Sequence, residues 1–377
     1  MISTSLSRRQ MVSALGMAAI VAPVCARVAL AKDAASSKAD AAASAKAASA
    51  AAGSASADGD ALKQQAGTVT FSVDMTAYEA GQTVRLWLSV PTTDEYQTIA
   101  DVAYESGGDV TPELGTDELG NQMVYVEWGA DAEPADRTLQ LSFHAVRDEV
   151  RVAPEDMVEK GEPGADVAQY LQGSSMVNVT DEAVQAQADE IVEGKTTYLD
   201  KARAVYDWVY ENMVRDEDVT GCGQGDICAL LNTRSGKCTD INSTFVGLCR
   251  AAGVPAKEVF GIRMNADDIT TNQHCWASFY LPGTGWIPAD PADVLKAVLK
   301  NGWDKADADA LKTKEYYWGG WDEKRVQLSA GRDLTLVPPQ DGEPLNDFGY
   351  PYAEVDGEAI DFYDPESFAY SVSFVQD

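Results

Sequence analysis

The spacing of apolar residues changes once along this 377-residue chain, and that change limits the possible fold more than any other feature. Up to about residue 152, apolar and polar residues alternate, as in the runs Val69–Met75, Val84–Val90 and Leu139–Ala145. A period of two predicts strands with one buried face, and the turn-rich pieces between the runs favour a small antiparallel sandwich. From about Val179 onward the apolar residues follow the period of a helix instead.

A second set of predicted strands follows these helices. Helical spacing begins after a cap at Thr180 or Asp181, stops at Gly194, and resumes over Leu199–Met213. Strand-like runs come next at "KEVFGIRM", "HCWASFYL" and "GWIPA", with "RDLTLVPP" as a further strand near the C-terminus. Helices followed by antiparallel strands predict an α+β domain after the sandwich.

These patterns divide the chain into five predicted segments. They are a signal peptide at 1–31, an Ala/Ser-rich disordered linker at 32–65, a β-sandwich domain at 66–152, a connecting segment at 153–180, and a helix-and-strand domain with C-terminal strands at 181–377. The linker has almost no branched or aromatic side chains, so it cannot bury enough apolar surface to offset the entropy of ordering.

The first 31 residues have the features of an export signal. Arg8 and Arg9 precede the apolar run Met11–Leu30, and a small-residue ending at Ala31 is typical of a cleavage site. The arginine pair looks like a twin-arginine signal, which carries folded cargo. A membrane anchor is the alternative, but Arg27 within the run argues against it. We therefore expect an exported protein, periplasmic, cell-surface or secreted, with no stable membrane insertion after cleavage.

The formal net charge of −31 restricts the partners. A surface this acidic repels phosphates, so we expect neither nucleic acid nor anionic membranes as partners. Beyond that exclusion, a dispersed excess of Asp and Glu is typical of a solvated, aggregation-resistant surface.

Two cysteines share one predicted helix in the stretch Gly236–Ala256, "GKCTDINSTFVGLCRAAGVPA". The helix begins at or near Cys238, where unpaired backbone N–H groups and the positive end of the helix dipole favour a thiolate. Cys249 lies about three turns later, near the carbonyl end, and is predicted to be a small buried apolar residue. Gly236 would allow a substrate carbonyl to approach the backbone closely.

A nucleophilic thiol needs a base, and the chain has two histidines. His144 falls on the polar face of a sandwich strand, which predicts a surface residue, so His274 is the candidate base. If residues 282–285 form a hairpin turn, the antiparallel register places 291–293 opposite His274. Asp290 lies one step from that window and Asp293 lies within it, so spacing leaves both open as the carboxylate that orients the imidazole.

Three segments together resemble the core of the transglutaminase-like superfamily over about Leu199–Val294: "GKCTDINSTFVGLCRAAGVPAKEVFGIRM", "HCWASFY" and "GWIPADPAD". A weaker likeness is present in "GRDLTLVPPQ" and "YPYAEVDG". The resemblance implies a papain-like, transglutaminase-like α+β core after the sandwich, and a cysteine enzyme with chain order Cys, His, Asp. Position by position, it implies Cys238 as nucleophile, His274 as general base and acid, and Asp290 rather than Asp293 as the orienting carboxylate.

Five further residues are weaker site candidates. Asn232, six residues before the nucleophile, has the spacing of a side-chain donor to the oxyanion in papain-like enzymes, although a loop Asn is more often a turn former. Trp276 and Trp286 are candidates for the cleft wall, against the commoner role of core tryptophans. Cys222 and Cys228 are expected to form a local disulfide, with pairing to Cys249 or Cys275 left open.

No metal or other cofactor is expected. The chain lacks a C-x-x-C motif, and its two histidines fall in different predicted domains. The acidic turn around Asp307 and Asp309 lacks the glycine and distal glutamate of a calcium loop.

The sequence thus favours an exported enzyme that hydrolyses peptide or amide bonds through a thioester, with a protein, peptide or cell-wall peptide as substrate. Two alternatives stay open: cross-linking of Gln to Lys side chains by the same chemistry, and a non-catalytic cell-surface binding module.

Overall fold

A computed structural model describes residues 61–377. The predicted signal peptide and all but the last five residues of the predicted linker lie outside the described residues. The first strand begins at Gln64, two residues inside the predicted end of the linker, a difference within the usual uncertainty of element boundaries. Among residues 61–377, no helix is both long enough and apolar enough to cross a membrane.

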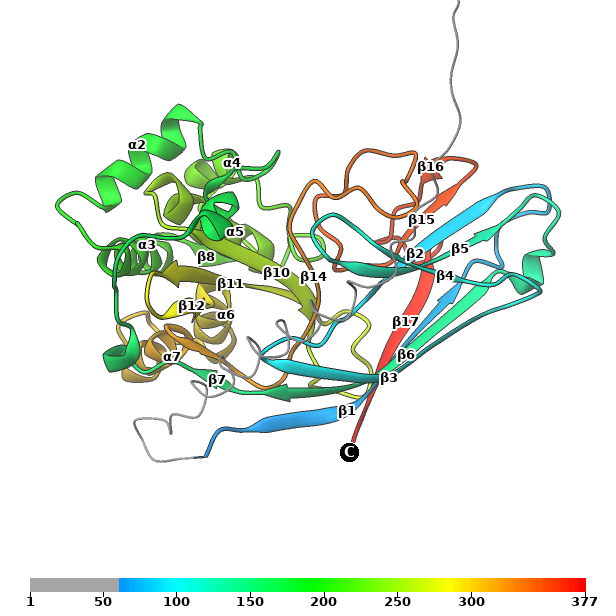
Figure 1. Ribbon diagram of the computed structural model, residues 1–377, viewed down its shortest axis with the longest axis horizontal. Helices are drawn as coiled ribbons and strands as arrows, with labels where there is room; N and C mark the ends of the chain where they lie inside the picture. The colour runs from blue at the N-terminus through cyan, green and yellow to red at the C-terminus, as the bar shows by residue number, and fades with distance from the viewer. Residues whose placement is uncertain (1–60) are drawn as a thin grey trace, which may run out of the picture. The chain divides into compact units, whose positions relative to one another are not determined.

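Two antiparallel sheets form a sandwich (Figure 1). In order across the first sheet, its strands are β17 (Ala369–Gln376), β1 (Gln64–Asp74), β6 (Thr138–Asp148) and β3 (Gln97–Ser106). Those of the second are β16 (Glu358–Ala359), β15 (Tyr352–Val355), β2 (Val84–Val90), β5 (Gln122–Trp128) and β4 (Glu113–Thr116). Phe71 and Leu141 of the first sheet share one buried core with Leu86 and Val126 of the second. The predicted period-two runs are therefore the inward faces of this sandwich.

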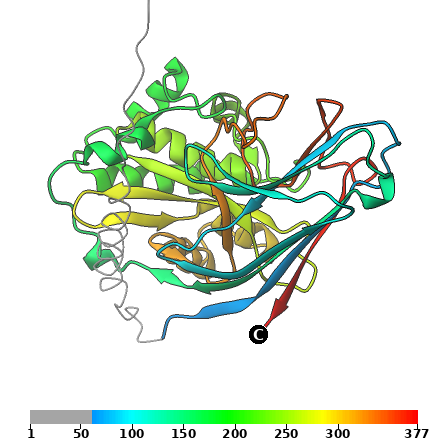
Figure 2. The same ribbon diagram turned by 45° about the vertical axis from the view of Figure 1, so that its right-hand side comes forward.

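Strands from both ends of the described chain build the sandwich. Val372 of β17 lies opposite Phe71 of β1, and Ala353 of β15 lies opposite Leu86 of β2. Figure 2 shows the red C-terminal strand running beside the blue strand β1. We expected the C-terminal strands to belong with the helical part of the chain, whereas this pairing places them in the sandwich sheets. Their inward residues complete a core that the earlier strands cover only in part.

A second four-stranded antiparallel sheet carries the helices. Its order is β12 (Gly285–Ala289), β11 (Gln273–Leu281), β10 (Ala256–Ile262) and β14 (Val326–Ala330). Around it lie α2 (Glu182–Ile191), α3 (Tyr198–Asn212), α4 (Ile227–Thr233), α5 (Cys238–Ala251), α6 (Pro291–Asn301) and α7 (Ala308–Tyr317) (Figure 1). Helix α5 packs on β10 and β11, and Phe245 of α5 meets Phe279 of β11 in the core. This is the predicted α+β arrangement.

Short elements connect these parts. Strand β7 (Val150–Arg151) pairs with β13 (Gly320–Trp321), and β8 (Val214–Arg215) pairs in parallel with β9 (Ser235–Gly236). Three 3₁₀ turns lie at Pro134–Asp136, Pro154–Asp156 and Ala165–Leu171.

Side-chain caps fix where the helices of the site begin. As expected, Asp181 caps α2, accepting from two backbone N–H groups of its first turn. Asp240 plays the same part for α5 from within the helix, because its Oδ2 accepts from Lys237 N at 3.0 Å. Asp290 caps α6 by accepting from Asp293 N at 3.1 Å. The start of α5 therefore fixes the position of Cys238, and the start of α6 fixes that of Asp290.

One predicted strand is wrong. The segment "RDLTLVPP" forms no strand and contributes only an isolated bridge between Leu334 and Leu345. Leu334 and Leu336 alternate because they pack on Trp87 of the sandwich, while the following Pro338 has no N–H to donate to a ladder. One-sided burial thus produced the strand-like pattern, and β14 takes the place of the fourth strand.

Candidate active site

Cys238 is the first residue of α5 and lines a pocket of about 510 Å³. Cys238 is 3% exposed, so its sulfur lies at the floor of the pocket rather than at the protein surface. The first-turn N–H groups of a helix have no acceptor within the helix and carry the positive end of its dipole. The thiol therefore lies where negative charge is stabilised. Cys249, on the same helix, is fully buried away from this end, as expected.

The β11–β12 hairpin brings a histidine and a carboxylate together. Ala277 lies opposite Ala289, which is the register expected from the turn. The chain leaves β12 at Asp290, and the Oδ2 atom of that residue lies 2.9 Å from His274 Nε2. Asp293 Oδ2 is farther away, at 3.5 Å from the same nitrogen. Both carboxylates that the spacing left open reach the imidazole, and Asp290 makes the closer contact.

The environment lowers the pKa of the Cys238 thiol well below its ordinary value. The largest cause is a hydrogen bond with Cys222, followed by one with Cys275; burial opposes them, and a hydrogen bond and the charge of His274 act in the same direction as the thiols. The pKa values of both neighbouring thiols are raised. Burial is the largest cause for Cys275, and the hydrogen bond with Cys238 is the largest cause for Cys222. One thiolate is thus stabilised by two neighbouring thiols and an imidazole.

The expected disulfide between Cys222 and Cys228 is wrong. All five cysteines that the structure describes are free. Cys228 lies in the first turn of α4, where its N–H donates to the capping Asp226 at 3.1 Å. Cys222 lies in the preceding loop, with its Sγ atom 3.3 Å from Gln273 O. The helix cap therefore holds Cys228 apart from the loop that carries Cys222 to the nucleophile.

A buried guanidinium group supports the carboxylate of the pair. Arg325 Nη1 donates to Asp290 Oδ2 at 2.8 Å, and Nη2 contacts both Asp293 and Asp322. Arg263 in turn contacts Asp293 and Asp322. Burial raises the pKa of Asp290, but His274, Arg325 and Arg263 outweigh it and hold that pKa below its ordinary value. The Asp290 side chain is therefore ionised and fixed when it meets the imidazole.

The same groups also have the spacing of a metal site. Ligand atoms of His274, Asp290 and Asp293 all lie within 4.8 Å of one another. Two guanidinium groups already occupy the carboxylate oxygens, and a divalent cation would be repelled by both. The donor set fits proton transfer better than metal binding.

Asp240 organises the loop beside the nucleophile. Its Oδ1 accepts from Gln224 N at 3.1 Å and from Gly225 N at 2.9 Å, while Oδ2 caps α5. A Cβ atom on Gly236 would lie 2.4 Å from this carboxylate. The glycine thus makes room for Asp240, which is a different reason from the substrate approach that we expected. A glycine at 223 faces the same carboxylate.

Three other sequence candidates do not line the pocket that holds Cys238. Asn232 lies in α4 and donates to Cys228 O at 3.2 Å, so it is not placed as an oxyanion donor. Trp286 lies in β12, beneath Lys257 Nζ at 4.3 Å from the ring. Trp276 is 1% exposed and stacks on His274 with ring centroids 5.9 Å apart, so it supports the base from behind and forms no cleft wall.

Sequence reasoning gave Cys222 a different role, that of a disulfide partner, and missed three residues of the site. The missed residues are Asp240, Asn242, which donates to Asp290 Oδ1 at 3.2 Å, and Arg325. An acidic residue in the third helical position signals a cap and would have indicated Asp240. Arg325 has no local signal, because it reaches Asp290 from the start of a strand 35 residues later.

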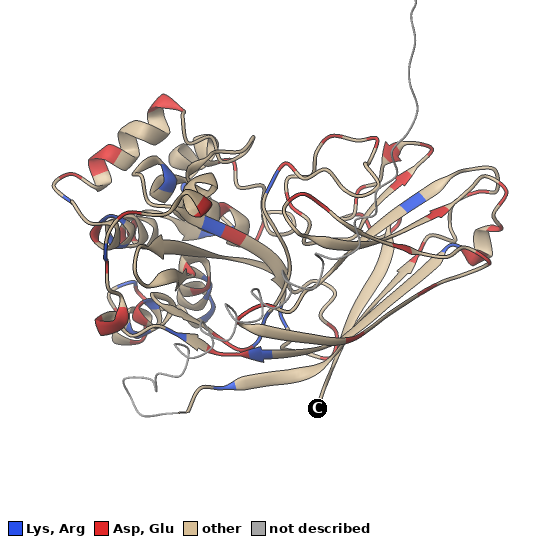
Figure 3. Ribbon diagram, viewed as in Figure 1, with Lys and Arg blue, Asp and Glu red and all other residues tan. Residues whose placement is uncertain are grey.

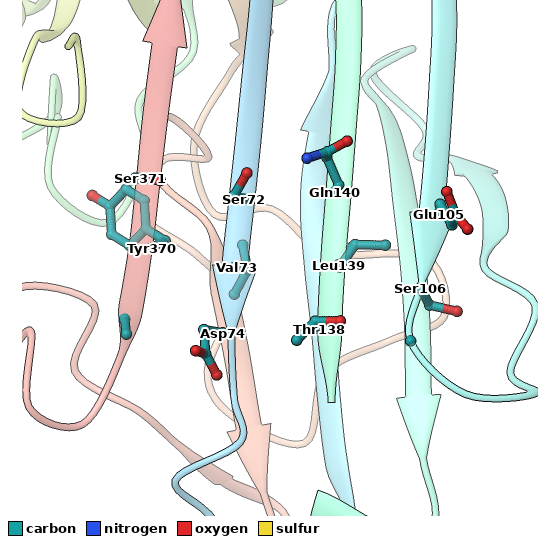
Figure 4. Close-up of a pocket in the computed structure, with 12 residues that line it drawn as sticks. Ser72, Val73, Asp74, Glu105, Ser106, Thr138, Leu139, Gln140, Tyr370 and Ser371 are labelled. Atoms are coloured by element: carbon teal, nitrogen blue, oxygen red, sulfur yellow. The ribbon is translucent and has the colours of Figure 1, made fainter. Parts of the chain in front are cut away.

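A larger pocket, of about 640 Å³, lies on the sandwich (Figure 4). It spans four neighbouring strands, and its charged lining residues are Asp74 and Glu105. It contains no cysteine or histidine, whereas Cys222 and Cys238 line the smaller pocket. His144 lies outside both pockets, with its Nε2 atom 3.1 Å from Asp377.

Comparison with known sequences identifies the class of protein. A sequence model of the transglutaminase-like superfamily matches residues 185–291. A protein of Haemophilus influenzae, itself uncharacterized, is 34% identical over 333 residues, covering 80% of this chain and 89% of that protein. The chain therefore belongs to the transglutaminase-like superfamily. An uncharacterized Bacillus subtilis protein, YebA, is 28% identical over 127 residues, covering 29% of this chain and 17% of YebA.

Solved structures resemble the chain more distantly. A candidate cysteine protease from Cytophaga hutchinsonii has a TM-score of 0.47 at 17% identity, covering 84% of this chain and 98% of that one. The periplasmic domain of TgpA from Pseudomonas aeruginosa has a TM-score of 0.33 at 15% identity, covering 60% and 93%.

Proposed function

We propose that the protein is an exported cysteine enzyme that hydrolyses peptide or amide bonds through a Cys238–His274–Asp290 triad and a thioester. One observation carries the proposal: His274 Nε2 lies 2.9 Å from Asp290 Oδ2, and the same imidazole is near enough to the thiol at the start of α5 to help lower the pKa of that thiol. A base that is oriented on one side and faces a nucleophile on the other is the arrangement that nucleophilic catalysis requires.

The first half-reaction forms the thioester. Cys238 Sγ attacks the amide carbonyl carbon, and the electron pair of the C=O bond moves to oxygen. The backbone N–H of Cys238, free of a helical acceptor at the first position of α5, is placed to stabilise that oxyanion. The intermediate then collapses, the C–N bond breaks, and His274 gives its Nδ1 proton to the departing amine.

The second half-reaction releases the acyl group. His274, now neutral, takes a proton from water as the water oxygen attacks the thioester carbon. The C–S bond breaks, the acid departs, and Cys238 returns to the thiolate. Asp290 accepts from Nε2 throughout, and so stabilises the imidazolium in both steps.

The charges of the pocket favour water over an amine as the acceptor. Arg215, Lys237, Arg263 and Lys296 all line the pocket that contains Cys238. A lysine ammonium that approached the thioester would meet like charges, whereas water meets no such barrier. This supports hydrolysis rather than cross-linking of Gln to Lys.

The sequence supports the location and the substrate class that we propose. The twin-arginine-type segment at 1–31 supports export, and an exported acyl-transfer enzyme meets proteins, peptides and cell-wall peptides. These are the partners that we propose, with no nucleic acid among them.

The test uses the full chain, pure and reduced, with a glutamine-containing protein and a labelled amine. Mass spectrometry then follows hydrolysis products and amine incorporation together. We expect hydrolysis to exceed incorporation and to disappear in Cys238→Ala. Cys228→Ala, which removes a half-buried thiol outside the pocket, should keep the activity.

Other outcomes would assign a different role. Incorporation that outruns hydrolysis would identify a cross-linking enzyme. If neither reaction occurs and a thiol-directed probe also leaves Cys238 unlabelled, the chain is a binding module and the proposal fails.

A further inference from the structure

The pocket around Cys238 has a charge opposite to that of the chain. The whole sequence carries a formal charge of −31, and Figure 3 shows acidic residues spread over the helices, strands and loops. Four cations line this pocket, and Glu217 is the one carboxylate among its lining residues. An inverted local charge requires a physical cause, because chance placement on so acidic a chain favours the other sign.

Three of the four cations have partners that account for part of their charge. Arg263 is held from behind by Asp293 and Asp322. Arg215 Nε lies 3.0 Å from Glu217 Oε1, and Lys237 Nζ is 3.9 Å from Glu217 Oε2. A single carboxylate thus serves two cations.

Lys296 on α6 makes no ion pair with any residue in 61–377. Burial first, and then the charges of Arg263 and Arg215, lower the pKa of Lys296. The cations are therefore close enough to repel one another, and the negative charges of Cys238 and Glu217 offset the repulsion only in part. An arriving anion would relieve it.

These cations also lie close to the reacting sulfur. The charge on Cys238 raises the pKa of both Arg215 and Lys296, so both are within electrostatic reach of the thiolate. Lys237 immediately precedes Cys238 in the chain. A substrate carbonyl at the thiol would thus have its neighbouring groups beside Arg215 and Lys296.

We propose that this pocket selects acyl donors that carry a free carboxylate within one or two residues of the scissile amide, with Lys296 and Arg215 as its binding groups. The inference rests on the proposed hydrolase function and names its substrate class. Arg215 offers a planar fork that suits a carboxylate, and Lys296 offers a point charge. The aromatic residues Tyr350, Phe362 and Tyr363 line the same pocket and supply apolar contact for the rest of the peptide.

The test uses a peptide library derived from a digested proteome and the full chain. Cleavage sites are mapped by mass spectrometry, and pairs of peptides that differ only by Glu against Gln beside the cleaved bond are then timed. We expect roughly tenfold or greater preference for the acidic member in kcat/KM, the size of one charge-assisted hydrogen bond.

The variants report the ratio of acidic to neutral rates, so that a general loss of activity cancels. Lys296→Met should reduce the ratio towards one, Lys296→Arg should retain most of it, and Lys300→Met should leave it unchanged. Lys300 is exposed on the same helix and does not line the pocket. Salt should reduce the wild-type ratio.

The outcomes separate this inference from the proposed function. Cleavage of acidic and neutral peptides at equal rates overturns the inference and leaves the hydrolase intact. Preference for the acidic peptide that persists in Lys296→Met and in Arg215→Met places the recognition elsewhere and also overturns it. Absence of cleavage and of thiol labelling at Cys238 means that the proposed function itself has failed.

Discussion

Arg325 and Asp290 form an ion pair with both side chains at 0% exposure, Nη1 to Oδ2 at 2.8 Å. The same oxygen faces His274 Nε2. The pair thus connects the proposed triad to the buried cluster formed with Asp293 and Asp322. Because Asp290 receives a proton donor and a guanidinium at one oxygen, its position depends on both.

Removal of Arg325 should destabilise the fold strongly. Arg325→Met would leave three carboxylates in a buried region with one fewer cation, and we expect a loss of about 3–5 kcal/mol in the free energy of unfolding. Urea denaturation measures it. Arg325→Lys should recover part of the loss, and Lys324→Met, at the exposed neighbouring position, should change little. Equal stabilities of Arg325→Met and the wild type would show that the cluster contributes nothing.

Alkylation of Cys238 should remain fast in mildly acidic solution. The lowered pKa gives Cys238 a larger thiolate fraction in mildly acidic solution than an ordinary thiol with a pKa of about 8.5 has there. His274→Ala should slow iodoacetamide labelling there about a hundredfold, since the imidazole no longer stabilises the thiolate. Peptide mapping follows the label, with His144→Ala as the control. Undiminished labelling of His274→Ala would refute the role of the imidazole.

Cys222 should tune the nucleophile. Its hydrogen bond is the first cause of the lowered pKa of Cys238. Cys222→Ala removes the donor, so the pH at which labelling of Cys238 is half-maximal should rise by about one unit or more. Cys222→Ser keeps a donor and should lie closer to the wild type. The rate of labelling against pH gives the comparison, and identical profiles for all three proteins would exclude this contribution.

Stability should fall as the solution becomes acidic. The folded-state pKa values of Asp290 and Asp322 lie below the value of about 3.9 for a free aspartate, so their contribution is present above that value and is lost as pH falls through the folded pKa. Urea midpoints between pH 7 and pH 3 should show the onset of this loss, which is at most about 1 kcal/mol for each carboxylate at pH 3.

Asp322→Asn is the variant that tests this origin. It should be less stable than the wild type at pH 7 and should lose less on acidification. The exposed Asp309→Asn should follow the wild-type curve. If the stability of Asp322→Asn fell with pH as steeply as that of the wild type, the acid sensitivity would belong to other groups.

Sequence spacing placed Asp290 and Asp293 near His274 because that relation is local, and the family resemblance supplied the choice of Asp290. The start of a helix places Cys238, and the register of one short hairpin brings His274 and Asp290 within 2.9 Å. The spacing of apolar residues likewise predicted the sandwich strands and the order of the helices, because the spacing within one strand or helix shows which of its faces is buried.

Two wrong predictions have local causes, and one missed residue has a long-range cause. Asn232 has the right spacing from the nucleophile, but α4 turns its amide back to Cys228 O. Cys222 and Cys228 are close in sequence, yet a helix cap separates their roles. Arg325 has no pattern around it that points to Asp290, because the two residues lie 35 positions apart in the chain and meet only in the folded protein.

The pairing of β1 with β17 delays completion of the sandwich sheet until the end of the chain has been synthesised. Phe71 must wait for Val372, about 300 residues later, before its strand gains the second neighbour. At ordinary translation rates the interval is roughly 15–60 s. Throughout that time one edge of β1 and part of the sandwich core stay open to other strands. The nascent chain is therefore exposed to misassociation at this edge while the segment between β6 and β17 is being made.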